Sequence, residues 1–169
     1  MKLNTEPYTL KPFKFPKDFC VIIDTNEQRP LFTPPPQGLI TLHHCIPIIY
    51  STQLRGGDYT LKGFEDKIVV ERKQAGDLRT YVGAERKKTD IKRQYLACLD
   101  FAGLVIESSW EDIMSPDLYS RITPAMIEGT LASMEVKNGI HIFCNRDRKM
   151  LERKILYWFL KFYEQQRTI

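Results

Sequence analysis

The stretch from Gly57 to Asp77 constrains the fold of this chain more than any other segment, because it has the pattern of a β-hairpin that leads into a helix. Two strand-like runs, residues 58–62 and 67–72, flank a four-residue connection, residues 63–66, that begins with glycine. Alternating or β-branched residues on both sides of a short glycine-containing loop indicate a hairpin.

The four-residue loop predicts the register of this hairpin and gathers three charged side chains. It pairs Thr60 with Val69, and one more two-residue step places Asp58 directly opposite Glu71. Because side chains alternate between the two faces of a strand, Lys73 lies on the same face as Glu71. The hairpin is therefore predicted to present two carboxylates and one ammonium group together.

Two opposed carboxylates repel each other and need a cation nearby. At about 4 Å the repulsion costs about 4 kcal/mol for an effective dielectric near 20, and hard carboxylate oxygens suit Mg²⁺ or Mn²⁺. Such an ion binds phosphate oxygen and lowers the pKa of a bound water, and an adjacent ammonium group orients the attacking oxygen. An ordinary hairpin face with three solvated charges has the same spacing, so both interpretations stay open.

Positive charge is concentrated directly after the hairpin. The span from Arg72 to Arg93 holds eight basic and three acidic residues, although the net charge of the whole chain is only +4. A basic stretch beside a carboxylate site suits a polyanion such as nucleic acid. A solvated helix face would carry the same charges and remains the alternative.

The remaining sequence predicts one α/β domain. The chain has 169 residues, enough for one compact core. The proline-punctuated residues 1–18 are expected to form an extended arm before a domain at 19–169. Apolar patterning and helix start and stop signals predict strands at 19–23, 40–50, 104–106 and 140–144, and helices at 77–82, 89–101, 123–137 and 147–166. Gly103 is the expected stop signal of the helix at 89–101. This order predicts a mixed sheet with helices on both faces.

The last helix carries a wide apolar and aromatic stripe. The stripe comprises Leu151, Ile155, Trp158, Phe159 and Phe162. Either it packs onto the sheet, or part of it faces a partner subunit.

Cysteine usage and hydropathy favour a cytoplasmic protein without a membrane span. No apolar run approaches the roughly 20 residues that span a bilayer. The cysteines form no CxxC pair, and we interpret them as reduced core residues. The run His43-His44-Cys45 lacks partner ligands at zinc spacing and is interpreted as part of a strand.

Two short motifs resemble those of the XPF-family nucleases. Gly57-Asp58, Glu71-Arg72-Lys73 and Asp77 resemble the family pattern G-D, E-R-K-x-x-x-D, and Asp24-Thr25-Asn26-Glu27 resembles D-x-R-E. The resemblance covers residues 19–166. It implies a restriction-endonuclease-like three-layer domain, a mixed β-sheet flanked by helices, that cuts branched DNA (flaps, forks or junctions) with Mg²⁺ or Mn²⁺ in repair, recombination or replication.

The resemblance also implies roles for individual residues. Asp24, Asp58 and Glu71 would hold the metal, with Glu27 as a weaker candidate. Lys73 would position or activate the attacking water.

Two further residues of the motif receive more open roles. Arg72 points to the opposite face by strand parity, which implies a structural or phosphate-directed role. Asp77 lies where the helix begins, and it would orient Lys73, support the metal-binding residues without touching the metal, or favour the positive helix end. The family arginine is Asn26 here, and Arg29 is the nearby candidate to replace it.

The resemblance is to small microbial or viral members that consist of the nuclease domain alone. It implies a homodimer formed through the C-terminal helices, in a microbial or virus-infected cell. Two other functions stay open: a catalytically silent DNA-binding or scaffolding member of the fold, which Asn26 favours, and a nuclease that cuts plain duplex DNA.

Overall fold

The computed structural model describes residues 14–32, 48–51, 54–83, 86–117 and 120–168, without the side chains of residues 86 and 87. Within these residues the strands form one six-stranded sheet in the order β2-β1-β3-β4-β5-β6. The strands are β1 (Val21–Asp24), β2 (Ile48–Ser51), β3 (Tyr59–Leu61), β4 (Ile68–Gln74), β5 (Phe101–Glu107) and β6 (Ile140–Cys144). The helices are α1 (Ala75–Val82), α2 (Arg86–Leu96), α3 (Trp110–Ile113), α4 (Pro124–Asn138) and α5 (Arg148–Arg167).

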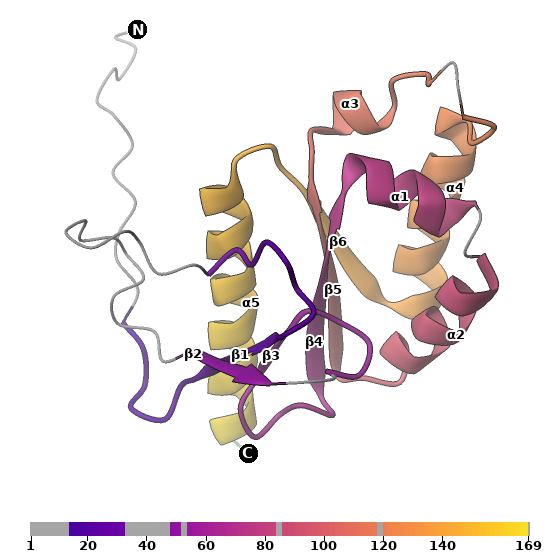
Figure 1. Ribbon diagram of the computed structural model, residues 1–169. Helices are drawn as coiled ribbons and strands as arrows, with labels where there is room; N and C mark the ends of the chain where they lie inside the picture. Colours follow the sequence, from indigo (N-terminus) through magenta and orange to yellow (C-terminus); the bar gives the residue numbers. More distant parts are fainter. Residues whose placement is uncertain (1–13, 33–47, 52–53, 84–85, 118–119, 169) are drawn as a thin grey trace, which may run out of the picture.

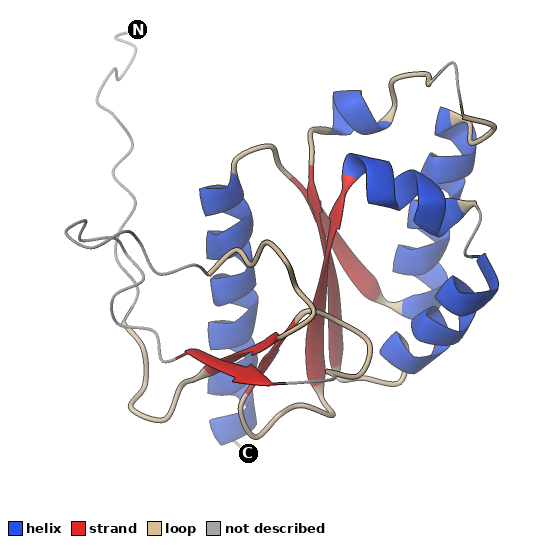
Figure 2. Ribbon diagram, in the orientation of Figure 1, coloured by secondary structure: helices blue, strands red, loops and turns tan. Residues whose placement is uncertain are grey.

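The sheet is mixed and has helices on both faces, as predicted (Figures 1 and 2). β3 pairs antiparallel with β1 and β4, whereas β1–β2, β4–β5 and β5–β6 are parallel. α5 covers one face, and α1, α2 and α4 cover the other. The sheet therefore separates two apolar cores.

The alternation of side chains along β4 decides which core each residue joins. Ile68 and Val70 are buried with the α5 core, whereas Val69 is buried with the α1, α2 and α4 core. By the same alternation, Glu71 and Lys73 face α1 and α2, and Arg72 faces the α5 side.

The predicted hairpin register is confirmed. Tyr59 pairs with Val70 and Thr60 with Val69, so the next pair outward is Asp58 and Glu71. The backbone N–H of Asp58 donates to the carbonyl of Val70 at 3.0 Å. β4 continues to Gln74, two residues beyond its predicted end, because it pairs in parallel with β5 as far as Glu107.

Gly57 allows the close approach of this hairpin. A Cβ atom at Gly57 would lie 2.2 Å from a Val69 methyl group and 2.9 Å from the Val70 carbonyl oxygen. Any larger side chain would push Asp58 away from β4. Steric crowding against β4 therefore explains why the residue before Asp58 is a glycine.

The prediction for residues 89–103 is partly wrong. The helix was expected to reach Phe101 and to stop at Gly103, but α2 ends at Leu96 and Phe101 begins β5. Gly103 lies within β5, where a Cβ atom would meet the Trp158 ring at 2.9 Å. The glycine is there because an aromatic ring packs directly on the strand, which local sequence does not reveal.

Helix ends with strong local signals agree with their prediction. α4 begins after Thr123, whose hydroxyl accepts a hydrogen bond from the Met126 N–H, and Pro124 occupies the first helical turn. It ends at Gly139, which has φ of 64°.

The aromatic stripe of α5 packs onto the sheet. Leu151, Ile155 and Phe159 are fully buried and Phe162 is 6% exposed. Trp158 is half-buried against the Phe101 ring. Packing onto the sheet is therefore what this stripe does within one chain.

The other expectations on single residues have mixed outcomes. Cys20 is buried and Cys144 is half-buried. Cys98 is exposed in the turn that follows α2, so the prediction that Cys98 belongs to the core is wrong. The run His43-His44-Cys45 and most of the expected arm lie outside the described residues. Among the described helices, none combines the length and apolarity that crossing a bilayer requires.

Candidate active site

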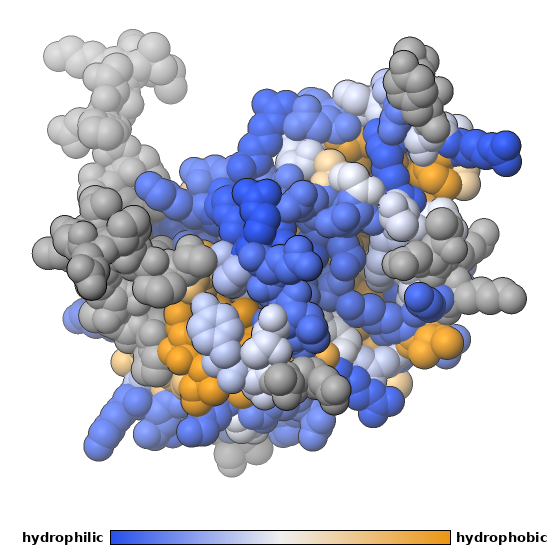
Figure 3. Space-filling view, in the orientation of Figure 1, coloured by the Kyte–Doolittle hydropathy of each residue, from blue (hydrophilic) through white to orange (hydrophobic). Residues whose placement is uncertain are grey.

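The candidate site lies where the hairpin meets α1 and α2. β4 runs directly into α1, so Glu71 and Lys73 lie just before the start of that helix. Asp58 precedes β3 and faces β4. Figure 3 shows that hydrophilic side chains gather in the middle of the face that lies between α5 and α1.

Glu71 is almost completely buried, with 3% of its surface exposed. Its Oε1 pairs with the Lys73 ammonium group. Its Oε2 accepts a hydrogen bond of 2.6 Å from the ammonium group of Lys92, which comes from α2. One buried carboxylate thus holds two cations from different elements.

Asp58 is the second carboxylate of the pair. Its Oδ2 accepts a hydrogen bond from the backbone N–H of Arg72 at 2.6 Å, and no group in the described part of the chain donates to its Oδ1. Burial, and then the negative charge of Glu71, raises the pKa of Asp58 to about 7. The two carboxylates therefore destabilise each other in the absence of a further cation.

Lys73 carries a stable positive charge at this site. Burial alone would lower the pKa of Lys73, but the charge and hydrogen bond of Glu71 outweigh burial and raise it. The ammonium group also lies 5.8 Å from the centre of the Tyr81 ring. An ammonium with a raised pKa orients and stabilises oxygen atoms, and it does not accept protons near neutral pH.

Asp24 lies at the end of β1, close to Asp58 along the backbone. The Asp24 N–H donates to the Asp58 carbonyl at 2.9 Å. The Asp24 carboxylate, however, accepts hydrogen bonds from the backbone N–H groups of Asn26 (2.7 Å) and Leu54 (2.6 Å). Asp24 therefore ties two loops together through both of its oxygens.

Arg72 lies on the opposite face, among residues that the motif alone does not connect. Its Nε and Nη2 donate to the two Glu27 oxygens at 2.9 and 2.8 Å, and its Nη1 donates to Glu107 at 2.9 Å. Glu107 also pairs with Arg148 at the start of α5. The network joins the loop after β1 to β4, β5 and α5.

The charges of this network are mutually stabilised. Burial would raise the pKa of Glu27, but the hydrogen bonds from Arg72 and Arg29 and the Arg72 charge outweigh burial and lower it. The same Glu27 contacts raise the pKa of Arg72 above its usual value, against its burial. Both groups are therefore ionised at neutral pH.

The remaining predicted site residues lie at the rim. Asp77 is exposed in the first turn of α1, and no hydrogen bond joins it to Lys73, both being described residues. The Arg29 side chain is exposed, while its N–H donates to Glu27 and its carbonyl accepts from Arg148. Asn26 is exposed as well.

Three charged residues of the site were not selected from the sequence: Lys92, Glu107 and Arg148. Lys92 stood within the basic stretch, and Glu107 ended a predicted strand. Neither position in the sequence indicates that the side chain reaches Glu71 or Arg72. The signal that singles them out is tertiary.

The donor chemistry fits a divalent ion held by two carboxylates. Asp58 and Glu71 oppose each other, and Asp58 Oδ1 is available, whereas both Glu71 oxygens are paired with lysine ammonium groups. Within the described residues, no group of three or more His, Cys, Asp or Glu side chains is placed to hold a metal. Asp24 does not join the pair while its oxygens are bonded to backbone N–H groups.

The fold and this pair define a class of protein. The mixed six-stranded sheet with flanking helices is a restriction-endonuclease-like fold, with the carboxylates and the lysine on its central hairpin. Residues 20–156 match the ERCC4 domain, so the chain belongs to the ERCC4 domain family, a family of DNA endonucleases. The expected XPF-type nuclease domain is confirmed.

Two solved structures share this fold. XPF from Aeropyrum pernix is 22% identical, with a TM-score of 0.56, and the match covers 76% of this chain and 57% of that chain. XPF from Aeropyrum pernix in complex with DNA is 20% identical, with a TM-score of 0.62, covering 87% of this chain and 66% of that one. This chain thus spans less than two thirds of either structure. No curated protein sequence matches it.

Proposed function

We propose that this protein is a metal-dependent endonuclease that hydrolyses phosphodiester bonds at branched DNA, with residues 19–169 as its nuclease domain. The observation that carries the proposal is the opposed pair Asp58 and Glu71, with the Lys73 ammonium on Glu71. Membership in a family of DNA endonucleases and the fold of a structure determined with DNA support it.

The proposed mechanism assigns a separate task to each residue of the site. A divalent ion, when bound, supplies Lewis-acid stabilisation of the phosphate and lowers the pKa of water. Asp58 and Glu71 would hold it, and Asp24 would join only by exchanging its hydrogen bonds to backbone N–H groups.

Lys73 would orient the attacking water and stabilise the charge that develops on the phosphate. The charge and hydrogen bond of Glu71 raise the pKa of Lys73, which favours the protonated side chain that this task requires. Asp77 would contribute through the N-terminus of α1, where a negative charge is favourable. Arg72, Glu27 and the backbone of Arg29 would hold the hairpin in place from the opposite face.

The proposed function is tested by a panel of end-labelled DNAs. Flap, fork, four-way junction and linear duplex substrates are incubated with the protein and Mn²⁺, with and without EDTA. We expect cleavage of at least one branched substrate, weak cleavage of linear duplex, and complete loss in EDTA, because Asp58 and Glu71 need a cation.

Each other outcome of the panel identifies an alternative. Binding of branched DNA without cleavage at any Mn²⁺ concentration would indicate the catalytically silent member of the fold. Equal cleavage of linear and branched DNA would contradict the preference for branches. Cleavage that persists in EDTA would contradict metal dependence.

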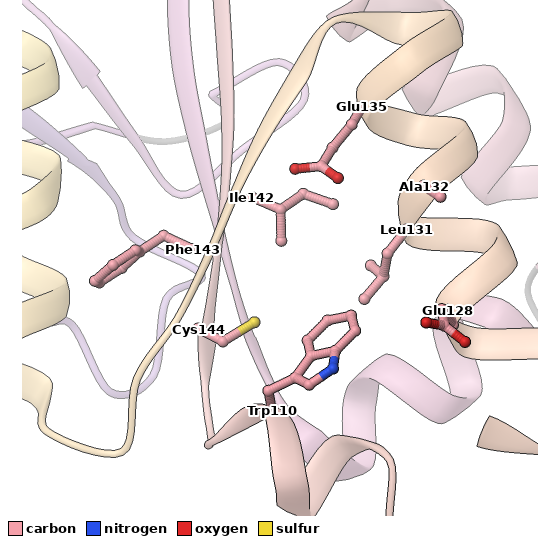
Figure 4. Close-up of a pocket in the computed structure, with 8 residues that line it drawn as sticks. All are labelled: Trp110, Glu128, Leu131, Ala132, Glu135, Ile142, Phe143 and Cys144. Carbon is pink, nitrogen blue, oxygen red and sulfur yellow. The ribbon is translucent and has the colours of Figure 1, made fainter. Parts of the chain in front are cut away.

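We also propose that the protein forms a homodimer through α4 and β6, since all residues of the α5 stripe except the half-buried Trp158 are buried against the sheet. β6 is an edge strand of the described sheet, and an edge strand exposes unpaired backbone groups. Beside it lies a groove of about 420 Å³ lined by Trp110, α4 and β6 residues (Figure 4). Trp110 is 43% exposed there.

The dimer is tested with a charge placed in this groove. Ala132→Glu adds bulk and a negative charge beside Glu128 and Glu135, so we expect light scattering to show a dimer for the wild type and a monomer for the variant. Ala125→Glu, on the same helix but not lining the groove, is the matched control and should remain dimeric. A monomeric wild type at all concentrations would contradict the dimer.

A further inference from the structure

Lys92 has a position that the motif residues do not explain. It is the second cation on Glu71, with its Nζ 2.6 Å from Oε2, and it comes from α2 rather than from the hairpin. Lys73 and Glu71, by contrast, lie two residues apart on the same strand. The carboxylate is therefore shared between a cation that the hairpin holds and a cation that a separate helix brings.

The two lysines differ in how they are held. Lys73 is 24% exposed and also lies against the Tyr81 ring, whereas the side chain of Lys92 is 30% exposed. Among the described residues, Glu71 is the one with which the Lys92 ammonium group forms a hydrogen bond or an ion pair. Lys92 can therefore leave Glu71 by a change of its own rotamers, without moving the hairpin.

The charges at the site make the Lys92 contact conditional. Asp58 and Glu71 bring two carboxyl groups to the site, and Lys73 and Lys92 bring two ammonium groups, both of them on Glu71. A divalent ion at the carboxylates would add two positive charges and compete with the lysines for the Glu71 oxygens, and Lys92 is the one of the two that the hairpin does not hold. A DNA phosphate at the same place would bring negative charge that a released ammonium can contact.

Given the nuclease function proposed above, we propose that Lys92 is an exchangeable counter-ion of the active site. It occupies Glu71 Oε2 in the metal-free protein and competes with a divalent ion for that oxygen. When Glu71 turns to the ion, Lys92 is released to contact a phosphate oxygen of the DNA at the cleavage site. Lys92 thus keeps the carboxylate pair balanced before the substrate arrives and supplies positive charge afterwards.

This role predicts two effects of opposite direction in Lys92→Ala. Removal of the competing charge should tighten Mn²⁺ binding to the DNA-free protein by about tenfold, because a charge a few ångströms away is lost. Loss of a charge on the phosphate should lower the single-turnover cleavage rate at saturating Mn²⁺ and DNA by about 100-fold. A residue that only holds α2 in place would weaken both Mn²⁺ binding and cleavage.

The experiment measures Mn²⁺ affinity by isothermal titration calorimetry and cleavage by single-turnover rates on the preferred branched DNA. Lys92→Gln keeps the length without the charge and should behave as Lys92→Ala. Lys92→Arg keeps the charge and should restore the single-turnover rate to within about tenfold of the wild type. Circular dichroism and urea unfolding establish that each variant is folded.

Lys88→Ala is the matched control for metal affinity. Lys88 is exposed one turn earlier on α2, so its loss removes the same charge from the same helix without touching Glu71. Its Mn²⁺ affinity should equal that of the wild type.

Different outcomes separate this inference from the proposed function. If the wild type binds Mn²⁺ and cuts DNA while Lys92→Ala binds Mn²⁺ no more tightly, or while Lys92→Gln cuts at the wild-type rate, the counter-ion role is wrong and the nuclease function stands. If the wild type neither binds Mn²⁺ nor cuts any DNA, both are wrong.

Discussion

Replacement of Asp58 by asparagine is expected to abolish DNA cleavage and, at the same time, to stabilise the metal-free protein at pH 8. Burial and the charge of Glu71 raise the pKa of Asp58 to about 7, so above this pH the folded protein holds an ionised carboxylate where a neutral group is favoured. Asparagine has the same shape, and its amide oxygen accepts the hydrogen bond from the Arg72 N–H.

The pH dependence of stability gives this prediction its sign. Asp58 has a pKa near 3.9 in the unfolded chain and a higher one in the fold, so the folded state binds more protons between the two values. Its contribution to stability is therefore fully present below about pH 4 and is lost as the pH rises to about 7. Between these pH values the free energy of unfolding of the wild type should fall by on the order of 2–4 kcal/mol. Asp58→Asn should not show this fall.

Two measurements check the prediction. Urea unfolding in EDTA from pH 4 to pH 8 should show a falling free energy of unfolding for the wild type and a flatter profile for Asp58→Asn. Single-turnover cleavage with Mn²⁺ should fall by at least about 100-fold, because the metal loses one of its two opposed carboxylates.

Asp66→Asn is the control, since Asp66 lies exposed in the connection of the same hairpin. It should change neither the pH profile nor the cleavage rate. An Asp58→Asn protein that cuts at the wild-type rate would remove Asp58 from the proposed metal site. One that is less stable than the wild type at pH 8 would contradict the repulsion between Asp58 and Glu71.

The parts of the site that local sequence predicts are those that chain connectivity determines. A four-residue loop leaves one register for the hairpin, so the opposition of Asp58 and Glu71 follows from counting residues. Strand alternation places Arg72 on the other face in the same way. The ends of α4 are predictable because Thr123 and Gly139 act on backbone groups a few residues away.

The parts that local sequence does not predict depend on how elements pack. Lys92 is 21 residues from Glu71, and nothing before the docking of α2 indicates that their side chains meet. Gly103 has the pattern of a helix stop, but it lies within β5, between β4 and β6. A glycine stands there because the Trp158 ring, 55 residues later, leaves no room for a side chain. In both cases the deciding contact belongs to a different element.

Asp24 illustrates why a motif does not determine the state of a side chain. Its place at the end of β1 was expected, and its backbone does lie beside that of Asp58. Its carboxylate nevertheless bonds to the Asn26 and Leu54 N–H groups, because a buried carboxylate accepts whichever donors the surrounding loops offer. Whether Asp24 binds metal therefore depends on the cost of releasing those two loops.

The largest loss of stability is expected from Arg72→Met. Arg72 is the cation that Glu27 and Glu107 share, and the side chains of Arg72 and Glu27 are 9% and 4% exposed. Methionine fills much of the volume but leaves Glu27 buried without its bidentate partner. Removal of one partner from a buried ion pair costs about 3 kcal/mol or more, which urea unfolding at pH 7 should measure.

A double-mutant cycle separates the ion pair from the loss of packing. Glu27→Gln removes the charge that Arg72→Met leaves unpaired, so the double variant should be more stable than Arg72→Met alone, by about 1–2 kcal/mol. If the two losses simply add, the charges of Arg72 and Glu27 are not coupled and the network does not stabilise the fold in the way its geometry indicates.

Arg146→Met provides the matched surface control. Arg146 also holds a carboxylate with two hydrogen bonds, of 2.7 and 2.6 Å to Asp112, but both side chains are exposed to solvent. Water replaces the lost partner there, so the loss of stability should be much smaller than for Arg72→Met. Equal losses at the two positions would mean that burial of the Arg72 network has no energetic consequence.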